Sequence, residues 1–292
     1  MTTTEKILLT GVTGNVGGAV LNRLYATNAD LRVLTRDEAQ ARSLRARGID
    51  VVVADFLKPE TLGPALAGVR QVFLLTPISP EQETQANNVI EAATRSGEQP
   101  RIVRLSVHQA SHEAPTRISR QHAAIEDALA TSGLPYTLLR PQSFMQNTLA
   151  SAPTVVAEGM IYQPFKAGKL AMIDVRDIAA VAEKVLTEPS HVGAVYTLTG
   201  PAAISFEDVA RSLSVTLGRD IRYVNVSLDA AKDAMLRRGV SAWMADALNE
   251  YAKAHSEGYS DFTTDDVERL TGHPPTSYAK FACDFAQRFG AE

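Results

Sequence analysis

The sequence has few of the residues that stabilise disulfide-linked or metal-centred domains. Cys283 is its only cysteine among 292 residues, so we expect no internal disulfide and no metal site built on cysteine. Cys283 lies in an apolar-periodic segment near the end of the chain, which predicts a packing role rather than a chemical one. The sequence also contains no internal repeat and no low-complexity segment.

Long apolar runs and an excess of positive charge are missing as well. No stretch of 18 apolar residues occurs, so we predict no membrane-spanning helix. The formal net charge is −4, whereas a nucleic-acid-binding protein is expected to carry a basic face. The N-terminal residues Met-Thr-Thr-Thr-Glu lead directly into a predicted strand, which predicts no signal peptide. We therefore expect a cytoplasmic protein that acts on a small molecule, not on nucleic acid or a membrane.

Apolar runs alternate with helical patterns over the first 140 residues. Hydrophobic residues make up 45% of the chain, enough for a packed core. Predicted strands cover 7–9, 31–34, 51–54, 72–75, 102–107 and 136–139, with helices at 36–47, 59–68, 83–95 and 120–131 between them. Continuous apolar strands separated by helices are typical of a parallel sheet that is covered on both faces.

The alternation weakens after Pro141. We predict strands at 171–175, 195–198 and 221–226, a helix that begins at the N-cap Asp177, and a helix between Ser205 and Gly218. Helical patterns follow at 229–238, 241–257, 264–271 and 276–289. The predicted fold is α/β, a Rossmann-type doubly wound parallel sheet with a smaller, mostly helical C-terminal lobe. We assign 1–147 and 170–200 to a nucleotide-binding domain, and 148–169 and 201–292 to the lobe.

A glycine-rich segment at 11–18 joins the first predicted strand to the first helix. Gly11 permits a tight turn, Gly14 lets the backbone approach a pyrophosphate, and Gly17 lets the helix pack on the strand. The N–H groups at the start of that helix would then face the anion. The other predicted contacts in this loop are Thr13, Asn15 and Val16. The spacing is G-x-x-G-x-x-G rather than G-x-G-x-x-G, so a glycine-rich turn without a ligand is the alternative interpretation.

The end of the second strand indicates which dinucleotide is bound. An acidic residue there binds the ribose 2′-hydroxyl of NAD, whereas an arginine accepts the 2′-phosphate of NADP. Thr35 is neutral and Arg36 follows it, which favours NADP(H) over NAD(H). Asp37 comes next and could reach a ribose hydroxyl instead. Asp55 and Phe56 follow the third strand and are expected beside the adenine, or else form an ordinary turn.

These segments, with others further along, carry a family resemblance that covers nearly the whole chain. The matching pieces are Gly11-Val-Thr-Gly-Asn-Val-Gly17, Val33-Leu-Thr-Arg36, Ala54-Asp-Phe56, His122-Ala-Ala-Ile-Glu126, Ser132-Gly-Leu-Pro-Tyr-Thr-Leu-Leu-Arg-Pro141, Phe144-Met-Gln-Asn147, Ile173-Asp-Val-Arg-Asp-Ile-Ala179, Thr263-Thr-Asp-Asp-Val267 and Thr271-Gly-His-Pro-Pro275. The chain resembles the NmrA-like branch of the atypical short-chain dehydrogenases/reductases. The resemblance implies a Rossmann core that binds NAD(P)(H). It also implies either quinone and azo-dye reduction or nucleotide sensing for partner proteins.

The catalytic pair that short-chain dehydrogenases normally carry is missing. Those enzymes place Tyr-x-x-x-Lys on the helix after the fifth strand, but residues 119–132 contain neither tyrosine nor lysine. Tyr162 and Lys166 have the spacing, yet Pro164 between them is incompatible with a helix interior. The usual alcohol–ketone chemistry is therefore not expected here.

His122 is the one candidate for a proton donor. It lies four residues before Glu126, so both side chains share one helix face. A neighbouring carboxylate would favour the charged imidazole, which could protonate a reduced substrate. A structural His122–Glu126 pair is the alternative. His108 and His112 lie in the loop after the fifth strand and receive no role.

Several residues at strand ends complete the candidate site. Thr76 and Pro77 end the fourth strand and are predicted cofactor contacts, and the Ser106 hydroxyl is expected at the nicotinamide ribose. Phe144 and Asn147 follow the sixth strand and are predicted to contact substrate with His122, Phe144 by stacking on a flat ring. For Phe144 and Asn147 the alternative is a cap on the turn into the second lobe.

Two functions agree with these residues. The first is an NAD(P)H-dependent reductase that passes hydride to a quinone, an azo compound or another flat electrophile. Such acceptors delocalise the product charge, so they need no strong acid from the protein. The second is a non-catalytic NADP(H)-binding redox sensor. The sequence leaves a homodimer or a protein partner open.

Overall fold

The computed structural model describes residues 5–291 and places them in two compact units. The first unit contains the chain as far as His112, together with Ser119–Arg140 and Ile178–Tyr196; the second contains Glu113–Ile118, Pro141–Asp177 and the chain from Thr197 onward. Within residues 5–291, no helix is long and apolar enough to cross a membrane.

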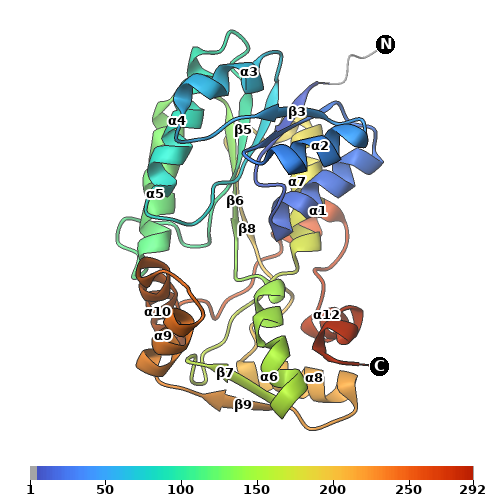
Figure 1. Cartoon of the computed structure of the whole chain (residues 1–292), viewed down its shortest axis with the longest axis vertical. Coiled ribbons are helices and arrows are strands. Elements are labelled where there is room, and N and C mark those ends of the chain that lie inside the picture. Colours follow the sequence, from blue (N-terminus) through green and yellow to red (C-terminus); the bar gives the residue numbers. More distant parts are fainter. Residues whose placement is uncertain (1–4, 292) are drawn as a thin grey trace. The chain divides into compact units, whose positions relative to one another are not determined.

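A seven-stranded sheet organises the fold (Figure 1). Its strands are β1 (Ile7–Leu9), β2 (Leu31–Thr35), β3 (Asp50–Val53), β4 (Gln71–Leu74), β5 (Arg101–Leu105), β6 (Tyr136–Pro141) and β8 (Val195–Leu198). The order is β3-β2-β1-β4-β5-β6-β8, and the pairs from β3 through β6 are parallel. This confirms the predicted Rossmann-type sheet. The strand order reverses between β1 and β4, where such sheets bind their ligands.

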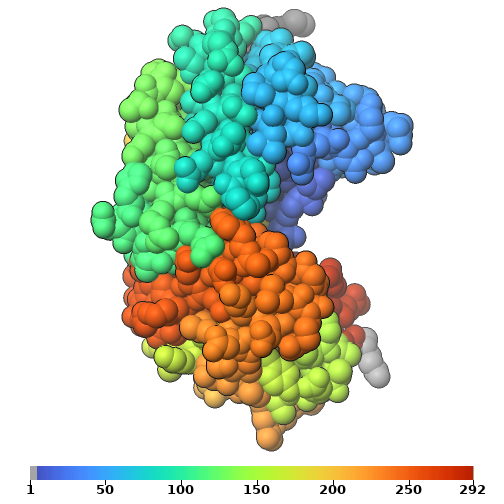
Figure 2. Space-filling view, turned by 60° about the vertical axis from the view of Figure 1, so that its left-hand side comes forward, coloured from blue at the N-terminus to red at the C-terminus, as the bar shows by residue number. Residues whose placement is uncertain are grey.

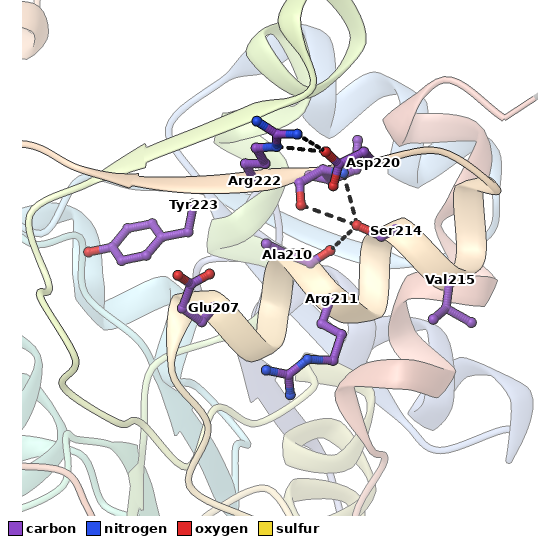
Figure 3. Close-up of a pocket in the computed structure, with 9 residues that line it drawn as sticks. Glu207, Ala210, Arg211, Ser214, Val215, Asp220, Arg222 and Tyr223 are labelled. Atoms are coloured by element: carbon purple, nitrogen blue, oxygen red, sulfur yellow. Dashed lines mark hydrogen bonds and ion pairs between the residues drawn. The ribbon is translucent and has the colours of Figure 1, made fainter.

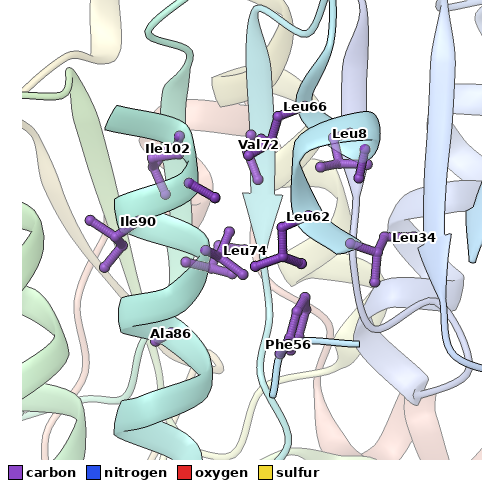
Figure 4. Close-up of a cluster of buried hydrophobic side chains, with 14 of the residues drawn as sticks. Leu8, Leu34, Phe56, Leu62, Leu66, Val72, Leu74, Ala86, Ile90 and Ile102 are labelled. Carbon is purple, nitrogen blue, oxygen red and sulfur yellow. The ribbon is translucent and has the colours of Figure 1, made fainter. Parts of the chain in front are cut away.

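Helices cover both faces of this sheet. They are α1 (Asn15–Ala26), α2 (Glu38–Ala46), α3 (Leu62–Leu66), α4 (Gln82–Arg95), α5 (Arg117–Thr131) and α7 (Val175–Thr187), with short 3₁₀ turns η1 (Pro59–Thr61) and η3 (Pro189–His191). Leu8, Val72 and Ile102 from the strands pack against α3, α4 and α5 through residues such as Leu62 and Ile90 (Figure 4). On the opposite face, an ion pair of 2.6 Å between Arg23 and Glu183 joins α1 to α7.

The second unit is mostly helical and has a core of its own. Its helices are α6 (Ala152–Glu158), α8 (Phe206–Leu217), α9 (Leu228–Arg237), α10 (Ala242–Ser256), α11 (Asp266–Thr271) and α12 (Tyr278–Asp284), with 3₁₀ turns η2 (Met145–Ser151) and η4 (Ala286–Phe289). Parallel strands β7 (Met160–Gln163) and β9 (Arg222–Asn225) form a small sheet. Phe281 and Leu213 are at the centre of the core. The α9–α10 pair, orange in Figure 2, forms exposed surface of this unit.

The predicted ends of α8 are confirmed. The Ser205 side chain accepts a hydrogen bond from the Asp208 backbone N–H, and the Asp208 carboxylate accepts one from the backbone N–H of Ser205, which is a complete capping box. Gly218 ends the helix in the left-handed conformation with φ of 63°, which costs glycine less than any other residue.

Four local predictions are wrong. Residues 171–175 form no strand, because Ile173 makes only an isolated bridge to Phe144 and the buried segment packs in the second unit's core. Asp177 does not cap α7, which begins two residues earlier, at Val175; its carboxylate accepts hydrogen bonds from Thr276 instead. Strand β7 is missing from the prediction. Cys283 lies on an exposed face of α12, because the helix turns its neighbours Phe281 and Ala282 inward.

The start of α1 is held close to the glycine loop. Gly11 has φ of 67°, as the tight turn requires. A Cβ at Gly17 would come within 2.2 Å of the Gly11 carbonyl oxygen, so only glycine lets the helix come this close. The neighbour across the contact is the loop rather than the strand that we predicted. Gly17 therefore sets the distance between α1 and the end of β1.

We expect Gly17→Ala to destabilise the protein more than Gly18→Ala does. The Gly17 methyl would overlap backbone atoms and force α1 outward, a form of overpacking that costs about 1–3 kcal/mol. At Gly18 the nearest atom to an added Cβ is the Val12 oxygen at 3.3 Å, a tight contact that needs only a small shift, and alanine favours a helix interior. Chemical denaturation of both variants measures the two free energies of unfolding. Equal values would contradict this account of α1 packing.

Candidate nucleotide-binding site

The candidate site residues of the first unit follow the ends of neighbouring parallel strands. The glycine loop follows β1, and Thr76 and Pro77 follow β4, the two strands between which the order reverses. Thr10 joins the two strand ends, because its hydroxyl accepts the Leu75 N–H at 2.8 Å and also lies within hydrogen-bond distance of the Leu75 oxygen. The fold thus brings the loops after β1 and β4 together.

The N-terminus of α1 has the properties of an anion site. Gly14 occupies the N-cap position, no side chain caps the helix, and no acidic residue lies in its first turn. The first N–H groups of a helix have no partner within it, and the helix dipole favours negative charge there. Gly14 has φ of −88° and ψ of 171°, a conformation open to any residue, and an added Cβ would meet only the Gly11 oxygen at 3.5 Å. The fold alone therefore does not require glycine at position 14.

The remaining loop residues differ in exposure. Thr13 and Asn15 are exposed, while Val16 is buried beneath the turn. The structure thus leaves the side chains of Thr13 and Asn15 accessible and assigns Val16 to packing. Its backbone N–H still belongs to the first turn of α1.

Arg36 and Asp37 are adjacent but differ in what their side chains do. The Asp37 carboxylate caps α2, accepting the N–H groups of Ala39 at 2.7 Å and Gln40 at 3.3 Å. Arg36 is exposed, and its guanidinium makes no hydrogen bond or ion pair within the described part of the chain. A free cation therefore lies at the end of β2, beside a carboxylate that already has partners.

Asp55 and Phe56 form a turn after β3. The Asp55 carboxylate accepts the Leu57 N–H at 3.0 Å. The Phe56 side chain is buried in the core with Leu34 and Leu62 (Figure 4), and its carbonyl accepts a hydrogen bond of 2.7 Å from Asn88. The Phe56 ring thus packs inside the unit, and only its backbone and Asp55 lie toward the strand ends.

A buried polar network lies beneath the ends of β4 and β5. Arg104 is fully buried in β5 and donates to the Leu74 carbonyl at 3.0 Å and to the Thr76 hydroxyl at 2.9 Å. Gln82, also fully buried, places its Nε2 atom 3.3 Å from the same hydroxyl and 3.3 Å from His122 Nε2. Burial lowers the pKa of Arg104 to about 9, with Glu126 opposing that shift, so the guanidinium is charged at neutral pH.

The predicted pair of His122 and Glu126 does not form. Both residues are buried on α5, but Glu126 accepts hydrogen bonds from the Ser106 hydroxyl and the Arg140 guanidinium. His122 faces Gln82 instead. Burial, and next the charge of Arg104, lower the pKa of His122 well below its usual value. The expectation of a charged imidazole is therefore wrong, because the nearby carboxylate is already paired and the nearest charge is positive.

The other polar residues near the end of β5 differ in their burial and in their contacts. The Ser106 hydroxyl is buried and donates to Glu126, so its proton is directed into the protein. His112 is exposed and lies 2.7 Å from the Asp127 carboxylate, whereas His108 is buried.

Phe144 and Asn147 belong to the second unit. Phe144 is half-buried and is the N-cap residue of η2, with extended backbone bridged to Ile173. Asn147 is exposed, and its Nδ2 atom lies 3.5 Å from the Ser143 hydroxyl. Both residues thus have a local structural role, which is the alternative that the sequence left open, and their contact with substrate stays a prediction.

A surface depression of about 470 Å³ lies in the second unit between α8 and β9 (Figure 3). Two arginines that line it have carboxylate partners: Arg222 pairs with Asp220, and Arg211 with Asp208. The Ser214 hydroxyl bonds backbone atoms. Because these groups are already engaged, the depression is a weaker candidate than the strand ends of the first unit.

Comparison with known proteins agrees with this geometry. Residues 3–274 match the model of the NmrA-like family. The chain belongs to the NmrA-like family. The resemblance drawn from the motifs is therefore confirmed.

Three relatives of this NmrA-like protein are reductases whose descriptions name NAD(P)H, NADPH or NADP(H). It is 38% identical to NAD(P)H azoreductase of Xenophilus azovorans over 98% of this chain and 99% of the relative. The crystal structure of the NADPH-dependent quinone oxidoreductase from Escherichia coli, complexed with NADPH, superposes with a TM-score of 0.88 at 31% identity, covering 96% of this chain and 99% of the other. Triphenylmethane reductase of Citrobacter sp., complexed with NADP(H), gives 0.85 at 26% identity, covering 97% and 99%. These structural relatives bind NADPH or NADP(H).

Sequence reasoning did not identify Arg104 or Gln82. One signal was present, because Arg104 is a charged residue inside the apolar run of a strand predicted to be covered on both faces. Gln82 follows no pattern, since a helix start carries many polar residues and only the fold shows which of them point inward.

We expect acidification to destabilise the protein partly through His122. Its pKa is lowered in the folded state, so below pH about 6.5 the unfolded chain binds a proton that the folded chain does not, and stability falls as pH falls. Linkage limits this contribution to about 2 kcal/mol between pH 8 and pH 5. His122→Gln should reduce the loss, measured by denaturation at both pH values. His112→Gln, at an exposed position, is the control; an equal effect of both substitutions would contradict the assignment.

Proposed function

We propose that this protein is an NADPH-dependent reductase that acts on a quinone, an azo compound or another flat electrophile. Residues 1–147 and 170–200 are proposed to bind the nucleotide, and 148–169 with 201–292 to form the substrate lobe. The single observation that carries the cofactor assignment is the free Arg36 guanidinium at the end of β2, beside an Asp37 that caps α2. The relatives that bind NADPH support the same assignment.

The glycine loop fits a pyrophosphate. Gly11 and Gly17 are explained by the turn and by helix packing, but the local backbone at Gly14 would accept a side chain. We attribute the glycine at 14 to the space that a pyrophosphate needs beside the free N–H groups of α1. Bound NADPH supplies the hydride.

The buried face of α5 supports a substrate that needs no strong acid. His122 is neutral at neutral pH because burial and Arg104 lower its pKa, and Glu126 is held by Arg140 and Ser106. A quinone or azo group spreads the charge gained on reduction over a conjugated system, so water can protonate the product. This argument favours such acceptors over simple ketones.

The activity test follows NADPH oxidation by absorbance with a panel of quinones and azo dyes. We expect turnover by the wild type and none by Gly14→Val, whose side chain would occupy the pyrophosphate position while the fold is kept. Gly18→Ala is the control within the same helix. Unchanged NADPH affinity in a folded Gly14→Val protein, measured by calorimetry, would refute the assignment of the loop. Tight NADPH binding without turnover on any acceptor would favour a redox sensor instead.

Arg36→Ala tests the cofactor preference. A charge-assisted hydrogen bond contributes about 1.5–3 kcal/mol, so NADPH affinity should fall roughly 10- to 150-fold while NADH affinity stays nearly unchanged. Arg42→Ala removes another exposed charge of the same segment and should have a much smaller effect. Calorimetry with both cofactors separates the cases. Equal losses for NADH and NADPH would make Arg36 structural, and a wild type that prefers NADH would assign the ribose to Asp37.

A further inference from the structure

The Thr76 hydroxyl is in an unusual state for a buried group. A hydroxyl has one proton to donate and two lone pairs that accept. Both lone pairs are used, because Arg104 Nη2 donates at 2.9 Å and Gln82 Nε2 at 3.3 Å. Within residues 5–291 the Thr76 hydroxyl donates no hydrogen bond, although Thr76 is only 5% exposed. A buried donor without a partner carries a penalty of about 1–3 kcal/mol.

The buried charge of Arg104 is the second unusual feature of this network. A fully buried guanidinium loses its hydration, and replacing such a charge by a well-packed apolar residue is often neutral or stabilising. No carboxylate bonds it directly within the described chain; its Nη atoms bind the Leu74 carbonyl and Thr76. Stability alone therefore gives little reason for an arginine at this position.

Taking the proposed function as its basis, we infer that Arg104 and Gln82 are positioning residues that hold the Thr76 hydroxyl so that its proton is donated to an oxygen of the nicotinamide half of the bound dinucleotide. The two donors occupy the lone pairs and leave one direction for the O–H bond. The strand order indicates which half of the dinucleotide Thr76 faces. Arg36 follows β2, on the adenosine side of the point where the strand order reverses. Thr76 follows β4 and Arg104 lies in β5, both on the nicotinamide side.

The first test compares Thr76→Val with Thr76→Ser. Valine keeps the shape and removes the hydroxyl, so NADPH affinity should fall about 2- to 12-fold, the range of one hydrogen bond. Serine keeps the hydroxyl and should retain wild-type affinity. The affinity of 2′,5′-ADP, which lacks the nicotinamide half, should be the same in all three proteins. Calorimetry measures each dissociation constant.

The second test is a double-mutant cycle. Arg104→Met should weaken NADPH by a similar factor in the wild-type background and have little further effect in Thr76→Val, while the melting temperature holds or rises. The control is Arg101→Met, another buried arginine of β5 that donates to Gln71 at 2.7 Å and to the Glu188 carbonyl at 3.1 Å. Arg101→Met should leave NADPH affinity unchanged.

The variant Gln82→Glu provides a third, independent test. The carboxylate would accept the Thr76 proton and draw it into the protein, so NADPH affinity should fall as in Thr76→Val. The inference is overturned if serine behaves like valine, if the Arg104 and Thr76 losses add, or if 2′,5′-ADP weakens equally. Those results leave the proposed function intact. A wild type that binds neither NADPH nor 2′,5′-ADP would instead overturn the proposed function, and this inference with it.

Discussion

The candidate site depends on the close contact between Gly17 and the carbonyl of Gly11. Because no Cβ can stand between them, α1 begins directly at the end of β1, and its N-terminal N–H groups lie at the strand-order switch between β1 and β4. Thr10 holds the end of β4 against the same loop through Leu75. One short backbone contact thus determines where an anion can be held, and the neighbouring loops are arranged around it.

The second constraint is the polar network buried beneath the ends of β4 and β5. Interiors accept polar groups when every donor and acceptor is matched, yet this network leaves Gln82 Oε1, Arg104 Nε and His122 Nδ1 without partners in the described chain. The two buried arginines of β5 differ in this respect: Arg101, at the amino end, binds carbonyls and a glutamine side chain. The unmatched groups lie at the carboxyl end of the strands, where α/β proteins bind ligands.

The helix α5 shows how this chain departs from the short-chain dehydrogenase pattern. Its buried face carries a neutral imidazole and a carboxylate that arginine and serine already bind. The Tyr162-x-x-x-Lys166 spacing has no catalytic geometry, since Tyr162 lies in β7 and bonds Glu158 at 2.7 Å. The chemistry proposed for this protein therefore depends on the acceptor's own ability to delocalise charge.

The sequence by itself determined the parallel sheet, the glycine loop, the ends of α8 and the family. These features depend on local rules: apolar periodicity, turn residues and caps act between neighbours in the chain. Tertiary structure decided the rest. Helix spacing placed His122 and Glu126 on one face, but Gln82, Ser106 and Arg140, from other elements, decided their partners. The apolar pattern of residues 171–175 predicted a strand. A strand needs a neighbouring strand with which to form a ladder of hydrogen bonds, and Ile173 makes only an isolated bridge. The same physical reason applies to Thr76, whose hydroxyl acquires a direction only when two distant side chains fold against it.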